Sequence, residues 1–184
     1  MSKVVIAGDA SGTGTFTISA PNGNTDRTLV LPDEAGTVLT TAGVPASAMP
    51  AGSVLQVVQA VSTLSFSTSS TTYTATGHTA SITPSSATSK VLVVYGGNWC
   101  IQAANTQVDV TARSNQGATN LGLGTFYSAT ASGFTCTTLG FTFLDSPATT
   151  SSLTYTIHAK EAGLSGTVNT GTEVKTLTLM EIAA

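Results

Sequence analysis

The two histidines are the residues whose type could first suggest metal binding or acid–base chemistry. His78 lies in a turn rich in threonine and glycine, and His158 lies on the polar face of an alternating segment. They are 80 residues apart, and neither has a cysteine or a second histidine at the spacing of zinc ligands. We therefore expect no metal site, and we expect both rings to be exposed or to lie at an interface.

Carboxylates could form the acid–base pair of a glycosidase, which must converge to about 5–10 Å. Asp33 and Glu34 lie in the turn LPDEAGT, where carboxylates normally bond to nearby backbone N–H groups, and Asp109 and Asp145 are single acids on or beside strands. Serine is abundant, but no GxSxG motif supports a Ser-His-Asp triad. We expect no enzymatic activity and no cofactor.

Two glycine runs could be mistaken for phosphate-binding loops. They are GDASGTG at residues 8–14 and GLGTF at residues 122–126. Neither precedes a helical pattern or a Lys-Ser/Thr pair, so we expect these glycines to serve turns or bulges.

The two cysteines, Cys100 and Cys136, match no zinc or redox spacing. A disulfide would require their Cα atoms to lie within about 7 Å, which the sequence does not establish. We expect two small buried side chains with free thiols, because the cytoplasm keeps thiols reduced.

Trp99, in the segment GGNWC, follows the apolar run VLVV and is expected to be a core or subunit-interface anchor. The alternative is a glycan-stacking aromatic. Tyr73, Phe126 and Tyr127 would join it in a sugar-binding platform if their loops converged.

Asp26 and Arg27 form the adjacent pair of opposite charges near the N-terminus and are the candidate attachment contact. Our hypothesis is that Arg27 binds a carboxylate across a subunit boundary. The alternative is an exposed pair in a turn that contributes little. Reversing the charge at Arg27 without weakening that contact would dismiss the hypothesis.

The composition narrows the class of protein further. Of 184 residues, 35 are threonine and 21 serine; 8% are charged and 41% hydrophobic. Ordinary domains are about one quarter charged, whereas the apolar fraction is too high for a disordered chain. A net charge of −3 offers no basic field for nucleic acid, and no apolar run approaches the roughly 20 residues that cross a bilayer. Neither nucleic acid nor a membrane is an expected partner.

The local pattern indicates strands. Threonine and valine favour sheets, and no window has the 3.6-residue period of a helix. Apolar and polar residues alternate in residues 153–160 and 175–181, and Leu139, Phe141 and Phe143 share one face. We predict strands near residues 3–7, 14–19, 27–31, 36–40, 53–62, 71–76, 79–83, 89–95, 105–113, 121–127, 134–144, 152–160 and 172–182.

Many short strands separated by turn residues predict an all-β fold, an antiparallel β-sandwich of jelly-roll type with a small N-terminal β arm module. Residues 40–52, TTAGVPASAMPAG, carry two prolines and no charge, as is typical of a linker. We predict an arm at residues 1–40, a linker at 41–50 and a β-sandwich domain at 51–184. So short an arm needs a surface to pack on.

The stretch GDASGTGTFTISAPNGNTDRTLVLPDEAGTVLT (residues 8–40) resembles a module found near the start of many virion proteins of tailed bacteriophages. The segments PAGSVLQVVQA, SITPSSATSKVLVV and LTLMEIAA resemble the β-sandwich that follows it in fibre and capsid-associated proteins. The resemblance implies a structural virion protein, commonly a homotrimer. This chain has no shaft repeat, heptads or collagen-like period, which favours a compact protein over a long fibre.

The surface chemistry agrees with assembly, because small hydroxyl side chains lose little rotamer entropy on contact and weak charge limits repulsion between copies. We therefore expect a homotrimeric decoration (cement) protein that binds the major capsid protein or another virion protein and stabilises the head. The alternative is a short tail or head fibre, or a spike, that binds the host surface. A polysaccharide-cleaving tailspike is a third, weaker reading. Since the N-terminus lacks the apolar segment of a secretion signal, synthesis in the host cytoplasm is expected.

Overall fold

A computed structural model describes residues 11–13, 17, 22–24, 48–102, 105–117, 119–129, 134–162 and 166–184. The chain divides into two units, Met1–Val38 and Leu39–Ala184. Apart from three short pieces, the expected arm at 1–40 lies outside the described residues, as does most of the linker. The fold described below is that of the second unit.

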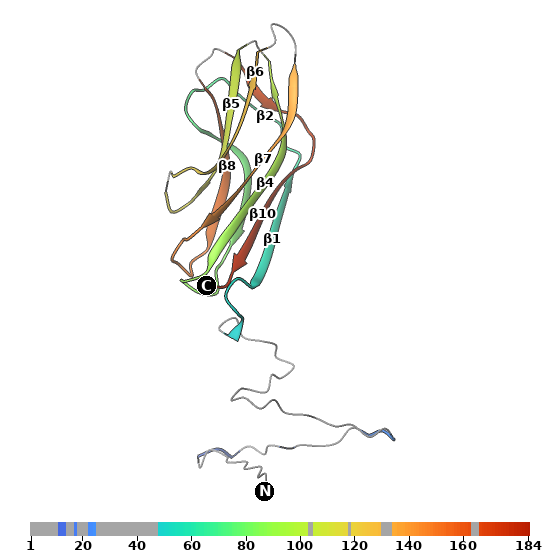
Figure 1. Ribbon diagram of the computed structural model, residues 1–184, viewed down its shortest axis with the longest axis vertical. Coiled ribbons are helices and arrows are strands. Elements are labelled where there is room, and N and C mark those ends of the chain that lie inside the picture. Colours follow the sequence, from blue (N-terminus) through green and yellow to red (C-terminus); the bar gives the residue numbers. More distant parts are fainter. Residues whose placement is uncertain are drawn as a thin grey trace. The chain divides into compact units, whose positions relative to one another are not determined.

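The second unit is an antiparallel β-sandwich, which confirms the predicted fold class; the jelly-roll form of it stays a prediction. Figure 1 shows the long strands β4, β7 and β10 side by side in one layer. One sheet, called sheet A, has the order β1-β10-β4-β9-β2, with β7 on the other side of β4; sheet B has the order β3-β8-β5-β6. The strands are β1 (Val54–Ser62), β2 (Phe66–Thr68), β3 (Thr74–Ile82), β4 (Lys90–Ile101), β5 (Thr106–Ser114), β6 (Leu121–Ser128), β7 (Thr135–Asp145), β8 (Leu153–Glu161), β9 (Val168–Thr170) and β10 (Lys175–Ile182).

Most predicted strands of this unit are present, with informative differences. The two strands expected at 71–76 and 79–83 form the single strand β3, whose register shifts between Ala75 and Thr79. Gly77, at φ +81°, lies in this bulge, where a residue with a side chain would be strained. β2 and β9 have three residues each, too few to produce an alternating pattern.

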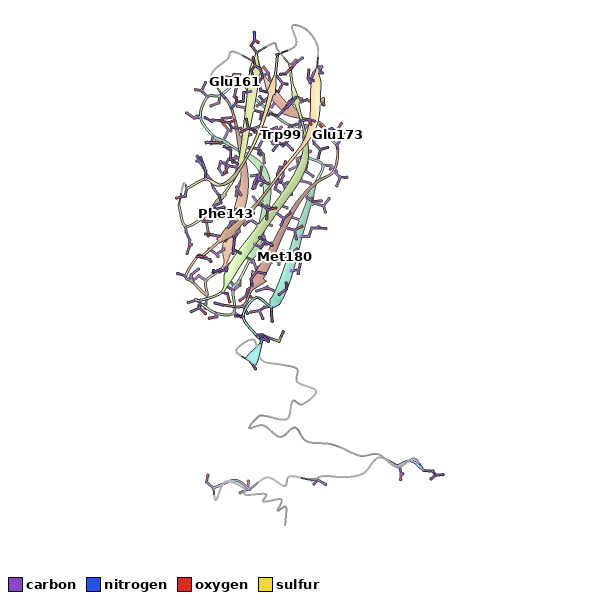
Figure 2. All side chains as sticks on the ribbon, viewed as in Figure 1. Trp99, Phe143, Glu161, Glu173 and Met180 are labelled. Carbon is purple, nitrogen blue, oxygen red and sulfur yellow. A yellow bond between two sulfur atoms is a disulfide. The ribbon has the colours of Figure 1, made fainter. Side chains whose placement is uncertain are left out.

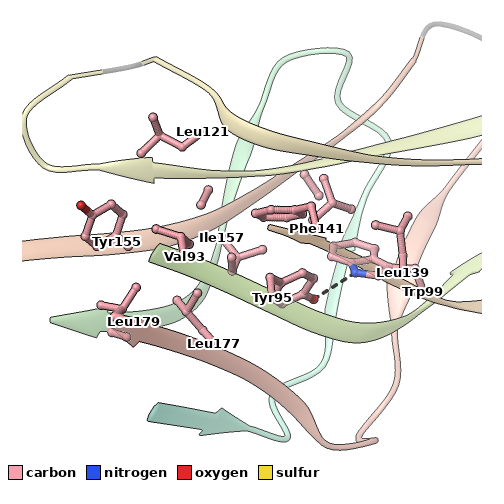
Figure 3. Packing of buried hydrophobic residues seen from close by; sticks show 14 of the residues in the cluster. Val93, Tyr95, Trp99, Leu121, Leu139, Phe141, Tyr155, Ile157, Leu177 and Leu179 are labelled. Atoms are coloured by element: carbon pink, nitrogen blue, oxygen red, sulfur yellow. Dashed lines mark hydrogen bonds between the residues drawn. The ribbon is translucent and has the colours of Figure 1, made fainter. Parts of the chain in front are cut away.

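The core lies between the two sheets and is formed by the inward-pointing residues of the alternating strands. In β8 the buried set is Leu153, Tyr155, Ile157 and Ala159, and the residues between them point outward. In Figure 3, Leu121 and Ile157 of sheet B lie opposite side chains of sheet A. The contributions of sheet A include Val93, Tyr95, Trp99, Leu139, Phe141, Leu177 and Leu179.

Of the alternatives for Trp99, the structure shows the core position. Its side chain is fully buried in the core of its own chain, where its ring packs edge-on against Phe66. Its indole Nε1 donates a hydrogen bond to the Tyr95 hydroxyl at 3.0 Å (Figure 3). No face of the ring is open to a sugar or to another subunit, so Trp99 is a core anchor. The segment GGNW continues β4 instead of ending it, which turns this side chain inward.

Tyr95→Phe is expected to destabilise the sandwich by about 1–2 kcal/mol, because the buried indole N–H of Trp99 loses its acceptor. Burial raises the pKa of the Tyr95 hydroxyl to about 12, so it stays protonated in ordinary buffers. Tyr127→Phe is the control, since the exposed hydroxyl of Tyr127 bonds to Asn105 at the surface. Urea unfolding of both variants measures the difference, and equal midpoints would contradict this role of Tyr95.

The expectation of free thiols is wrong, because Cys100 and Cys136 form a disulfide, with a Cα–Cα distance of 4.0 Å. The two residues are direct partners in the β4–β7 register. Opposite residues of antiparallel strands bring their side chains close together on one face, which is the geometry that a disulfide requires. Cys136 is exposed, so the bridge lies on the outer surface of sheet A.

Two charged residues of β10 point into the sandwich. Lys175 is 4% exposed, and its Nζ donates to the carbonyl oxygens of Gly171 and Glu173. Glu181 is fully buried, and its carboxylate accepts hydrogen bonds from Gln56 Nε2 and from the backbone and hydroxyl of Ser85, at 2.6–2.7 Å. These neutral donors satisfy a carboxylate that has no cation beside it in the described part of the chain.

Candidate functional site

The outer face of sheet A is almost free of charge. It is formed by the outward residues of β1, β10, β4 and β7, and Lys90, at its end, is the one charged side chain among those that the structure describes there. Val57 and Val61 are 57% and 59% exposed. Met180, labelled in Figure 2, lies on this face next to Val57. The face comprises Val57, Gln59, Val61, Leu92, Val94, Gly96, Asn98, Thr138, Gly140, Thr142, Leu144, Thr176, Thr178, Met180 and Ile182.

The size of this face can be judged from strand geometry. Four strands about 4.8 Å apart and about seven residues long cover on the order of 500 Å². Contact of this face with an equal area of a second copy would bury about 1,000 Å² in total, the least that a specific interface should bury. Because the residues are neutral, a second copy of the chain would meet no charge repulsion on this face.

The outer face of sheet B differs, because it carries a cluster of charges around Tyr73. The Arg113 guanidinium lies 4.8 Å from the centroid of the Tyr73 ring, and Lys160 Nζ lies 5.1 Å from it. Lys160 also forms an ion pair with Asp109 at 3.4 Å. Asp109 accepts further hydrogen bonds from Gln107 and Thr125, so it is held at one place in the cluster.

Beside this cluster the surface has an open concavity of about 360 Å³. Its lining combines one cation, one imidazole and several hydroxyl or amide groups. Burial lowers the pKa of His158, a backbone hydrogen bond to Thr156 raises it, and the nearby positive charge of Arg113 lowers it further. The lining residues are Arg113, Ser114, Asn115, Gly117, Thr154, Thr156 and His158.

The structure places the two histidines in different surroundings. His158 is half-buried on the outer face of sheet B, whereas His78 points inward and is 4% exposed, so the expectation that it is exposed is wrong. His78 Nε2 lies 3.2 Å from the carbonyl oxygen of Ala60, and within the described ranges its Nδ1 has no hydrogen-bond partner. Burial is the main cause that lowers its pKa, with Lys175 adding to it.

Two of the four candidate acids, Asp109 and Asp145, lie among the described residues, on different sheets. No group of three or more histidine, cysteine or acidic side chains is arranged to hold a metal there. Asp109 lies on sheet B, and Asp145 ends β7 of sheet A, where its Oδ2 accepts a hydrogen bond from Tyr155 at 2.8 Å. Asp33 and Glu34 lie outside the described residues.

The other candidates from the sequence do not gather into one site. Asp26 and Arg27 lie outside the described residues, so their proposed attachment role stays a prediction. Phe126 packs partly against the core, and Tyr127 is exposed on β6, so neither joins Trp99 in a platform. Gly122, at φ +72°, lies in β6 beside the register shift of β5, consistent with a bulge at the GLGTF run.

The Arg113 cluster was not predicted from the sequence. The alternation of residues 153–160 indicated a polar face, but the other residues of the cluster come from β5 and from the residue before β3. Charged residues are few in this chain and three of them meet here, so the scarcity of charge was the one signal that pointed to this cluster.

The sequence matches no family model, and no curated protein matches it. Within the part of the chain that the structure describes, no helix could span a lipid bilayer.

Proposed function

We propose that this chain is a structural virion protein of a tailed bacteriophage, a homotrimeric capsid decoration protein whose sandwiches associate through the outer face of sheet A. The observation that carries the proposal is the neutral character of that face: an extended sheet surface of aliphatic and hydroxyl side chains with one cation at its end. The resemblance of residues 8–40 to an arm module of phage virion proteins supplies the biological setting.

The physical role follows from binding to assembled geometry. A protein that binds across neighbouring shell subunits favours the closed lattice by its free energy of binding. A trimer would multiply the arms that attach each unit, so that weak individual contacts combine into strong attachment. Contact between copies would also cover the exposed valines of β1, an edge strand that could otherwise pair with foreign strands.

The number of copies per purified particle tests the location. Quantitative mass spectrometry of phage particles should find hundreds of copies of a decoration protein. A count of about a dozen would reject decoration in favour of a fibre or spike, and absence from particles would reject a virion role altogether.

Thr178→Lys is expected to weaken self-association at least about 100-fold, because it would bury an unpaired charge in a contact between copies. Thr178 is half-buried on the outer face of sheet A, and Thr156→Lys is the matched control, at a half-buried threonine of the outer face of sheet B. Sedimentation velocity over a dilution series measures both. Unchanged association of the Thr178 variant, or an equal loss in the control, would contradict the assignment of the interface.

A short fibre or spike that binds the host surface is the second candidate. The charged cluster around Tyr73 and the adjoining concavity favour it, since a surface used purely for packing has no need of such a site.

A further inference from the structure

Arg113 has hydrogen-bonding capacity that its own chain leaves unused. Its Nε donates to Asn120 Oδ1 at 2.9 Å, and its guanidinium packs on the Tyr73 ring. These two contacts fix the plane of the group. Its two terminal amino groups have no hydrogen-bond partner among the residues that the structure describes. A guanidinium fixed in this way is prepared for bidentate binding of a carboxylate or phosphate group.

His158 offers a second polar group to the same concavity. Its Nδ1 lies 3.1 Å from the carbonyl oxygen of Thr156, so this nitrogen carries the hydrogen. Its Nε2 has no partner in the described part of the chain. This atom accepts a hydrogen bond from a hydroxyl in the neutral ring and becomes a donor to an anion when the ring is protonated.

No carboxylate among the described residues lines the concavity. The acid of this face, Asp109, is occupied by Lys160, Gln107 and Thr125. Counting Arg113, Lys160 and Asp109, the face carries a net charge of +1 within a chain of net charge −3. The positive field at Arg113 is therefore not cancelled locally.

The remaining lining favours a sugar over a peptide. Ser114, Thr154 and Thr156 supply hydroxyl groups at an open surface, which suits the many hydroxyls of a saccharide. The concavity lies on the outer face of sheet B, so no free sheet edge is present there for a peptide to extend. Its lining also lacks the large apolar side chains that anchor peptides.

We propose that the concavity between Arg113 and His158 binds an acidic glycan, with Arg113 paired to the oxyanion of the sugar and His158 and the threonine hydroxyls bonded to its hydroxyl groups. The oxyanion is a carboxylate or a phosphate on the sugar, which present the same chemistry to the guanidinium. The site requires a single chain, so it does not depend on the trimer.

Calorimetric titration of the full-length chain tests the proposal. The probes are trigalacturonate as the carboxylate source, glucose 6-phosphate as the phosphate source and neutral galactotriose. We expect at least one acidic sugar to bind at least tenfold more tightly than galactotriose, and the stronger of the two identifies the oxyanion. Equal affinity for acidic and neutral sugars, or no binding of either acidic sugar, would overturn it. A triglutamate peptide that binds as tightly as the acidic sugars would overturn the assignment to a glycan.

Variants locate the site. Arg113→Gln should weaken binding about tenfold. Arg113→Lys keeps the charge without the planar fork, so its affinity should lie between those of the wild-type chain and the Arg113→Gln variant. Lys90→Gln is the matched control, because it removes a cation from the outer face of sheet A; its affinity should stay within twofold. A thermal melt of each variant checks that it is folded. A folded Arg113→Gln variant with unchanged affinity, or an equal loss in the Lys90 variant, overturns the site, and neither outcome affects the proposed interface on sheet A.

Discussion

Replacing both Cys100 and Cys136 by serine is expected to lower the free energy of unfolding of the sandwich by about 3–4 kcal/mol. The bridge closes a loop with a sequence separation of 36 residues, and constraint of the unfolded chain by a loop of that length gives this magnitude. The loop contains β5 and β6 of sheet B, and the bridge joins β4 to β7, two neighbouring strands of sheet A. Urea unfolding of the variant and of the wild-type chain gives the difference.

Reduction provides the control for this prediction. Dithiothreitol should lower the stability of the wild-type chain by a similar amount and leave the double serine variant unchanged. Since Cys136 is exposed, the reductant has access to the bridge without unfolding. Thiols that react in the native chain before any reduction, or a loss of stability below about 1 kcal/mol, would contradict the disulfide.

Glu181→Gln is expected to lower the free energy of unfolding by about 2–4 kcal/mol, although it only replaces one carboxylate oxygen by an amino group of similar size. The carboxylate accepts hydrogen bonds from Gln56 and from two groups of Ser85, and an amide would turn a donor toward them. Glu173→Gln is the control, because this residue is exposed and Lys175 binds its backbone oxygen. A variant at position 181 as stable as the control would show that the donors do not hold a charged carboxylate.

The same residue gives the stability a pH dependence. Burial alone would raise the pKa of Glu181, but the hydrogen bonds from Gln56, Ser85 and Ser89 outweigh it and hold the pKa below its ordinary value of 4.5. A folded-state pKa below that of the unfolded chain means that this contribution is complete above about pH 4.5 and is lost as the pH falls through the folded value. The stability difference between the wild-type chain and Glu181→Gln should therefore shrink below pH 4.5.

The faces of the strands could be predicted from the sequence because side-chain alternation is a local property. Leu177 and Leu179 had to be buried together, and Thr176 and Thr178 had to share the opposite face, whatever strands lay beside them. The same rule places Lys175 and Glu181 inside, which composition alone would not suggest for charged residues.

The features that could not be predicted depend on the register between strands that are distant in the sequence. The pairing of Cys100 with Cys136 follows from the β4–β7 ladder, and the cluster of Tyr73, Arg113 and Lys160 follows from the order β3-β8-β5. Neither register leaves a trace in the local pattern. Trp99 was ambiguous for a related reason: the strand before it was predicted to end at residue 95, but β4 continues through two glycines to Ile101.

The two outer faces of the sandwich differ in surface chemistry. Sheet A presents neutral side chains with the disulfide among them, and sheet B presents the cations and the concavity. We propose that the first face is used for contact between copies and the second for a ligand outside the assembly, so both can be occupied at once.

The mass of the full-length chain in solution tests the central claim most directly. Sedimentation equilibrium at micromolar concentration should give three times the chain mass of 18.4 kDa, with dissociation on dilution. A mass of one chain at every concentration up to the millimolar range would contradict the account, because a neutral sheet face that no copy covers would then have no role in assembly.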